Sequence, residues 1–152
     1  MNTEIAQKVI REIVATADVF LRESHRLFRP HGLTAAQYNV LNILAGTRDG
    51  KGLSQRELGD ILVVDRSNVT GLLDRMEKCG WVRRADDAKD RRIYRVELTA
   101  KGRKLWTRVE PLYAEVVRQL TEGADQRQMQ AALVLLAELQ SKAAIWSLSD
   151  SR

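Results

Sequence analysis

Apolar residues recur at intervals of three and four along much of this chain, the spacing of one face of an amphipathic α-helix. The first such stripe consists of Ile5, Val9, Ile13, Thr16, Phe20 and Leu27. It stops at Pro30-His31-Gly32, so we predict one long helix that ends there. The spacing returns near the C-terminus. A helix capped by Thr99 carries Leu105, Val109, Leu112, Val116 and Leu120, and after a break at Gly123-Ala124 a last helix carries Met129, Leu133, Leu136 and Leu139.

Shorter helices are predicted between these long ones by their N-terminal caps. Thr34 is followed three residues later by Gln37, and Ser54 by Glu57. This is the spacing of a capping box, in which each side chain accepts a hydrogen bond from the other residue's backbone N–H. We therefore expect helices over 34–45 and 54–62.

A third short helix is predicted over 65–79, with Asp65 as its cap and Gly80 at its end. The turn between it and the helix over 54–62 is only residues 63–65, the last of which is the cap, so the pair predicts a helix-turn-helix. After Gly80 the pattern changes to the alternation of strands, over 81–84 and 93–98, with a polar stretch between them that indicates a hairpin. The expected fold class is mainly α with a small β-hairpin.

Composition limits the kind of protein this is. The chain has 152 residues, 44% of them hydrophobic and 30% charged. This size suits one domain with a hydrophobic core, and no stretch approaches the ~18 consecutive apolar residues of a membrane span. We expect a cytoplasmic protein without a membrane partner. The single cysteine, Cys79, excludes an intramolecular disulfide and a multi-cysteine zinc site, and His25 and His31 make a poor metal pair. We expect no metal and no cofactor.

Positive charge is concentrated in one fifth of the chain. Residues 75–104 hold 11 basic and 5 acidic side chains, a net charge of +6, while the other 122 residues have a net charge of −1. A solvated positive face is the simpler interpretation of a charge run. Its place beside a helix-turn-helix favours an anionic partner instead.

The helix over 65–79 has two contrasting faces at 100° per residue. Its apolar side consists of Val69, Leu72, Leu73 and Met76, and its opposite side of Ser67, Thr70, Gly71, Asp74 and Lys78, flanked by Asn68 and Arg75. A small or polar outward face suits the major groove of DNA. Gly71 indicates either the close approach of another backbone or a weak helix position tolerated by packing.

Cations at the hairpin tip suggest a second contact. Lys89, Arg91 and Arg92 lie in this narrow turn, and such charges suit the minor groove or the phosphate backbone. An ordinary surface turn would also be polar, but it would not need this density of arginine.

The region from Met76 to Gly102 resembles the signature of the multiple-antibiotic-resistance regulator (MarR) family of winged helix-turn-helix transcription factors. The motif consists of Met76-Glu77, Gly80-Trp81-Val82, Asp90-Arg91-Arg92, Thr99 and Gly102. Upstream, the stretches LTAAQYNVL and GLSQRELGDIL are similar to the family pattern as well. Ala88 replaces a proline that is common in the wing, and Val69 stands where Leu, Ile or Ala is usual.

The resemblance implies a transcriptional regulator, most simply a repressor, that binds double-stranded DNA as a homodimer at a palindromic operator. Half-sites would lie about one helical turn, ~10 bp, apart. Its implied recognition-helix residues are Arg66, Ser67, Asn68, Thr70, Gly71 and Arg75, and its wing residues are Lys89, Asp90, Arg91 and Arg92. Asp90 would brace the wing, with Arg92 favoured over Arg91 for the minor groove.

The expected domain division follows from the same family resemblance and from the long apolar stripes of the terminal helices, which a small winged lobe alone could not cover. We expect a helical dimerisation region over 1–30 and 105–146 and a DNA-binding lobe over 33–104. Residues 147–152 are expected to be a disordered tail.

Many proteins that this chain resembles release DNA when a small aromatic or phenolic ligand binds between the dimerisation helices and the lobe. Tyr38, Trp106 and Tyr113 are the aromatic candidates for such a site. Aromatic residues at this spacing are more often core or dimer packing. Cys79 is a candidate redox switch, although a small buried residue at a helix end is the simpler interpretation.

Two other functions compete with DNA binding. An enzyme is not expected, because the loop GTRDGKG lacks the spacing and the Ser or Thr of a phosphate-binding loop, and no catalytic constellation is visible. A winged-helix adaptor for other proteins stays an alternative. It would need an uncharged or apolar recognition face, whereas this one is polar and flanked by arginines.

Overall fold

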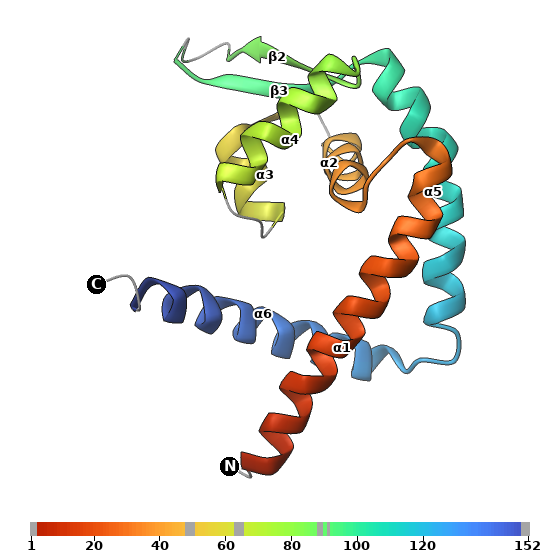
Figure 1. Ribbon diagram of the computed structural model, residues 1–152, viewed down its shortest axis with the longest axis vertical. Helices are drawn as coiled ribbons and strands as arrows, with labels where there is room; N and C mark the ends of the chain where they lie inside the picture. Colours follow the sequence, from red (N-terminus) through yellow and green to blue (C-terminus); the bar gives the residue numbers. More distant parts are fainter. Residues whose placement is uncertain (1–2, 48–50, 63–65, 88–89, 91, 150–152) are drawn as a thin grey trace. The chain divides into compact units, whose positions relative to one another are not determined.

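Helices form most of the chain, and short strands lie among them (Figure 1). The computed structural model describes residues 3–47, 51–62, 66–87, 90 and 92–149. The elements in chain order are α1 (Thr3–Phe28), the 3-10 helix η1 (Arg29–His31), α2 (Ala35–Ala45), β1 (Leu53–Ser54), α3 (Gln55–Leu62), α4 (Arg66–Lys78), β2 (Val82–Asp86), β3 (Tyr94–Leu98), α5 (Ala100–Leu120) and α6 (Gln126–Ser149). The mainly α fold with a β-hairpin is confirmed.

Both predicted capping boxes form. Gln37 N donates to Thr34 Oγ1 at 3.2 Å, and Thr34 N donates to Gln37 Oε1 at 2.9 Å. At α3, Glu57 N donates to Ser54 Oγ at 3.2 Å and Ser54 N donates to Glu57 Oε2 at 2.7 Å. The cap predicted at Asp65 lies outside the described residues.

The ends of the long elements also follow local signals. Gly80 and Gly123 adopt the left-handed backbone conformation, with φ of 71° and 75°, and terminate α4 and α5 as expected. Thr99 Oγ1 accepts from Gly102 N at 3.0 Å, which confirms Thr99 as the cap of α5. Helix α6 continues to Ser149, and the disordered tail expected over 147–152 stays a prediction.

The strands form an antiparallel sheet in the order β1-β3-β2. Strands β2 and β3 form the predicted hairpin, with Val82 opposite Leu98 and Arg84 opposite Val96. Strand β1 was not expected from the pattern, because two residues are too short to show alternation. It pairs Leu53 with Val96 and so connects the start of α3 to the wing.

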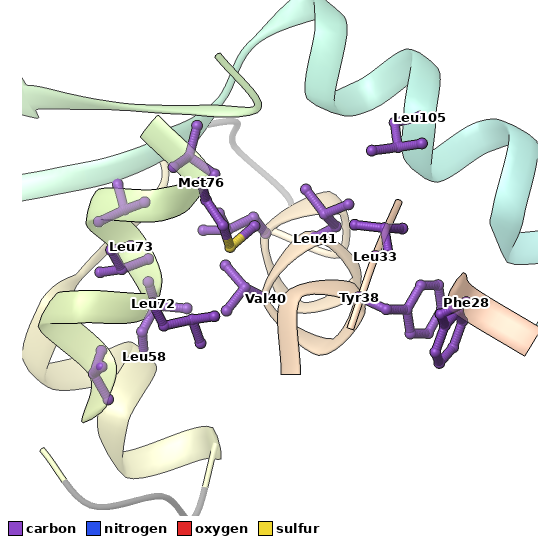
Figure 2. Packing of buried hydrophobic residues seen from close by; sticks show 14 of the residues in the cluster. Phe28, Leu33, Tyr38, Val40, Leu41, Leu58, Leu72, Leu73, Met76 and Leu105 are labelled. Atoms are coloured by element: carbon purple, nitrogen blue, oxygen red, sulfur yellow. The ribbon is translucent and has the colours of Figure 1, made fainter. Parts of the chain in front are cut away.

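The chain divides into two compact units, Met1–Ala114 and Glu115–Arg152. The first contains the hydrophobic core, where α2 packs among α3, α4, the sheet and the start of α5 (Figure 2). Its fully buried members include Tyr38, Leu41, Leu58 and Met76. The four residues predicted for the inner face of α4 are all buried here: Val69, Leu72, Leu73 and Met76.

Apolar side chains stay exposed on the long helices of each unit. On α1 these include Ile5, Val14 and Leu21, and in the second unit they include Leu120 and Leu133, each more than half exposed. None of the described helices has the length and apolar content needed to cross a membrane.

Candidate nucleic-acid interface

Helix α4 presents a polar face to solvent because its apolar face is held in the core. Asn68, Thr70, Asp74, Arg75 and Lys78 are exposed. Burial of the opposite face fixes the rotation of the helix about its axis, so the exposed side chains have a defined direction. This is the arrangement that a helix entering a DNA groove requires.

The other predicted recognition residues are placed as follows. Arg66 and Ser67 begin α4, and the structure describes their backbone but not their side chains. Gly71 is half-buried, and a Cβ there would meet Arg75 Nη1 at an ordinary contact distance of 3.5 Å. The part of the chain that the structure describes therefore provides no crowding that explains this glycine.

Thr70 is connected to the other helix of the helix-turn-helix. Its hydroxyl Oγ1 accepts a hydrogen bond of 2.5 Å from Nε2 of Gln55, the first residue of α3. The two helices also pack closely next to this hydrogen bond, since a Cβ at Gly59 of α3 would lie 3.7 Å from Val69 Cγ2 of α4. Gln55 thus belongs to the same exposed surface as the recognition residues, which the sequence pattern did not indicate.

Arg84 joins α4 to the wing. From strand β2 its guanidinium donates to Asp74 Oδ1 at 2.6 Å and to Glu77 Oε2. These hydrogen bonds, with Asp74 the larger contributor, raise the pKa of Arg84 above its usual range. The negative charge of Asp74 on the outward face is thereby balanced within the protein.

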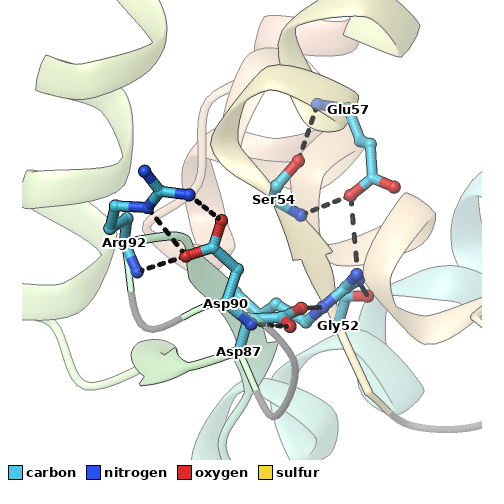
Figure 3. A network of polar contacts seen from close by, with 7 residues as sticks. Gly52, Ser54, Glu57, Asp87, Asp90 and Arg92 are labelled. Atoms are coloured by element: carbon cyan, nitrogen blue, oxygen red, sulfur yellow. Dashed lines mark hydrogen bonds and ion pairs between the residues drawn. The ribbon is translucent and has the colours of Figure 1, made fainter.

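The described part of the wing is built on two aspartates and an arginine (Figure 3). Asp90 Oδ1 accepts from both N and Nε of Arg92, at 3.0 and 3.1 Å, and Asp90 N donates to Asp87 Oδ1 at 3.1 Å. These hydrogen bonds from Arg92 hold the pKa of Asp90 below its usual range. The Arg92 side chain remains 90% exposed, so its charge faces solvent. Lys89 and Arg91 lie outside the described residues.

A second arginine anchors the base of the wing. Arg95 on β3 pairs with the buried Asp87, donates to the carbonyl of Gly52 at 3.2 Å and lies 3.7 Å from Glu57. The pKa of Glu57 is lowered, mainly by its hydrogen bonds with Ser54 and further by Arg95. One set of polar contacts therefore fixes the start of α3 and the wing to each other.

A hollow of about 390 Å³ lies between the start of α3 and the wing. It is lined by Ser54, Gln55, Arg56, Arg84, Arg92, Ile93, Tyr94 and Val96. Three of these residues are arginines, of which Arg84 pairs with Asp74 and Glu77 and Arg92 pairs with Asp90.

The aromatic candidates for a ligand site lie elsewhere in the first unit. Tyr38 is 1% exposed, stacks on Phe28 with 4.4 Å between ring centroids and lies 4.9 Å from the Tyr113 ring. Burial, with smaller effects from Glu110 and Tyr113, raises the pKa of Tyr38 from 10.0 to about 12. Trp106 is half-buried and its indole Nε1 donates to Asn42 Oδ1 at 3.1 Å. Tyr38 is thus a core residue, and the binding role of the three stays a prediction.

Cys79 is exposed just after α4, and its carbonyl accepts from Lys101 Nζ at 2.8 Å. Its burial was the simpler expectation and is wrong, because the side chain leaves the core where the helix ends. A redox role stays a prediction. The described residues contain no group of three His, Cys, Asp or Glu side chains that could hold a metal ion.

Comparison with known proteins agrees with this geometry. The family model described as MarR family matches residues 31–93. The "Transcriptional activatory protein BadR" of Rhodopseudomonas palustris is 32% identical over 75% of this chain and 68% of that protein. The "Homoprotocatechuate degradative operon repressor" of Escherichia coli is 31% identical over 73% of this chain and 76% of that protein.

Solved structures show the same fold. Sco3205 of Streptomyces coelicolor, a MarR family regulator solved in complex with DNA, has a TM-score of 0.76 and 26% identity over 90% of this chain and 86% of that one. CouR of Rhodococcus jostii RHA1, solved with p-coumaroyl-CoA, has a TM-score of 0.79 and 22% identity over 89% of this chain and 93% of that one. Sequence, winged fold and relatives together establish that this chain belongs to the MarR family of DNA-binding transcriptional regulators.

Proposed function

We propose that this chain is a homodimeric repressor that binds a palindromic operator and releases it when a small aromatic or phenolic ligand binds. The observation that carries the DNA part is the orientation of α4. Val69, Leu72, Leu73 and Met76 are buried, while Asn68, Thr70 and Arg75 face solvent. In the bound state, Arg66, Ser67, Asn68 and Thr70 reach base edges or nearby phosphates, and Arg92 enters the minor groove.

A second copy of the chain is the partner proposed for the long helices. Large hydrophobic side chains such as Ile5, Phe20 and Leu133 are 50% or more exposed, and exposed apolar faces of this extent favour association. A two-fold dimer would place two α4 helices about 10 bp apart on one side of the duplex, which matches a palindrome.

The ligand part rests on relatives and on chemistry. One relative is named as the repressor of an operon that degrades an aromatic compound, and CouR was solved with p-coumaroyl-CoA. Here Trp106 and Tyr113 are half-buried and lie against the core. An aromatic ligand would stack on these two rings, whereas reaching Tyr38 would require displacement of Phe28 or Tyr113.

The direct test is a fluorescence-anisotropy titration of the purified chain with its own upstream intergenic DNA and a scrambled duplex across a salt series. We expect selective binding that weakens steeply as salt rises, because bound phosphates release counterions. Equal, weak binding of both duplexes at low salt would contradict sequence-specific DNA binding and favour the adaptor function.

The ligand is tested in the same assay. Salicylate and p-hydroxybenzoate are added to the preformed complex, with cyclohexanecarboxylate as a control of equal charge and similar size. We expect release by an aromatic acid only, and loss of this effect in Trp106→Leu. Equal release by all three acids would indicate a nonspecific salt effect and contradict an aromatic site.

A further inference from the structure

Gln55 lies outside the recognition helix, yet it contacts one of the residues proposed to read DNA. Its side-chain amide Nε2 is 2.5 Å from Thr70 Oγ1, across the two helices of the helix-turn-helix. From this contact we propose that Gln55 is a positioning residue for specificity, which makes the Thr70 hydroxyl a hydrogen-bond donor toward DNA. This inference rests on the proposed function of α4.

The direction of the hydrogen bond carries the argument. A threonine hydroxyl has one hydrogen to donate and lone pairs to accept. Because Gln55 Nε2 donates, it occupies a lone pair of Thr70 Oγ1 and leaves the hydroxyl hydrogen free. The major-groove edge offers acceptors at N7 of purines, O6 of guanine and O4 of thymine. A donating Thr70 therefore favours bases with an acceptor at the contacted position.

Gln55 is itself held in place on both sides. Ser54, the preceding residue, pairs with β3 through Arg95 and caps α3 through its bonds with Glu57. Four residues further along, Gly59 packs against Val69, so the face of α3 that bears Gln55 is pressed onto α4. The amide thus approaches Thr70 from a fixed backbone rather than from a loop.

The bond lies at an exposed position, where water competes with both partners. Such a hydrogen bond contributes little to folding stability. Its main consequence is orientation of the hydroxyl, and the cost of losing it appears in base preference rather than in the free energy of unfolding.

The test begins with a preferred duplex, selected by the full-length wild-type chain from a randomised library. Anisotropy is then measured for this duplex and its single-base variants with Gln55→Met, Thr70→Val and the double variant. Methionine keeps the length of the side chain and valine the shape, and both remove the polar group. Arg56→Met, at the next residue and exposed, is the matched control for a contact with DNA phosphates that does not depend on the base sequence.

We expect Gln55→Met and Thr70→Val each to reduce discrimination at the same base pair by about fivefold, the size of one typical hydrogen bond. The double variant should lose no more than Thr70→Val alone, because Gln55 acts through that hydroxyl. Thr70→Ser keeps the hydroxyl and should retain the dependence on Gln55. Arg56→Met should weaken all duplexes alike and reduce the salt slope.

Three results would overturn the proposal. In the first, Gln55→Met leaves discrimination unchanged while Thr70→Val lowers it, which removes the role of Gln55 but keeps that of α4. In the second, the effects of the two variants add, which makes Gln55 an independent contact. In the third, the wild-type chain prefers no duplex, which also contradicts the proposed function. Urea denaturation of each variant separates these results from a loss of folding.

Discussion

Gly102 lies directly against Trp81: a Cβ at position 102 would be 2.0 Å from the Trp81 carbonyl oxygen. The first turn of α5 therefore packs on the backbone where the wing begins. Thr99 strengthens the same junction, since its Oγ1 donates to the Gly80 carbonyl at 2.6 Å and accepts from Gly102 N. The Thr-x-x-Gly spacing of the sequence is explained by this contact between helix and hairpin.

Gly102→Ala is expected to destabilise the protein, by about 3 kcal/mol, because backbone atoms must move to make room for the methyl group. The free energy of unfolding is measured by urea denaturation. Gly46→Ala is the control, since Gly46 has φ of −79° and its Cβ would have only ordinary contacts at 3.6 Å. An equal, small change in both variants would show that the junction at Gly102 tolerates a side chain.

Asp87→Ala is expected to loosen the wing. The Asp87 side chain is 9% exposed and pairs with Arg95, which also holds the Gly52 carbonyl. Loss of the carboxylate leaves a partly buried guanidinium without this partner, at a cost of about 2 kcal/mol in unfolding free energy. DNA affinity should fall as well, because Asp87 accepts from Asp90 N in the wing.

Asp86→Ala is the matched control for this variant, because Asp86 is exposed and loses the same charge one position away. It should unfold like the wild-type protein. If the two variants have the same stability, the contact of Asp87 with Arg95 does not stabilise the wing.

The sequence patterns predicted those features of the fold that depend on a few neighbouring residues. Each helix cap is formed by residues three positions apart, at Thr34, Ser54 and Thr99. The end of α4 is set by the left-handed backbone of Gly80 itself. The buried face of α4 was predicted from the spacing of its apolar residues at three and four positions. Each of these features is set by local geometry, which one sequence displays directly.

Contacts between distant segments were not predictable. Gln55 and Thr70 are 15 positions apart, and Arg95 bonds with the Gly52 carbonyl 43 positions away. No periodicity relates such pairs, because they meet only when α3, α4 and the sheet assemble. Tyr38 illustrates the same limit, since an aromatic residue has the same pattern in a core as beside a ligand.

Stability should decrease between pH 10 and 12 because of Tyr38. Its pKa is raised to about 12 in the folded protein, from 10.0. Above pH 10 the unfolded chain releases this proton while the folded chain keeps it, so rising pH favours unfolding by up to about 3 kcal/mol. Urea denaturation at pH 8 to 12 measures the slope, and Tyr38→Phe should make it smaller. Identical slopes would contradict the raised pKa.

Arg92→Ala should weaken binding to every DNA sequence and reduce the salt slope by about one. Asp90, which accepts hydrogen bonds from Arg92, is ionised at neutral pH as an aspartate normally is, so without the arginine its negative charge would face DNA unpaired by this cation. Anisotropy across a salt series measures both effects. Arg26→Ala, an exposed arginine of α1 that pairs with Glu23, removes the same charge and should leave the slope unchanged. An unchanged slope in Arg92→Ala rejects the role of this residue.

The proposed dimer is tested on α6, where Leu133 is 61% exposed. If a second copy covers this residue, Leu133→Glu places an unpaired carboxylate in an apolar interface, which costs several kcal/mol and raises the dissociation constant on the order of 100-fold. Sedimentation equilibrium measures the change, and Gln130→Glu adds the same charge at an exposed polar position of the helix. Circular dichroism checks that both variants keep their helices. If Leu133→Glu has the dissociation constant of the wild-type protein, the interface does not include Leu133, because a charge buried in it would weaken association.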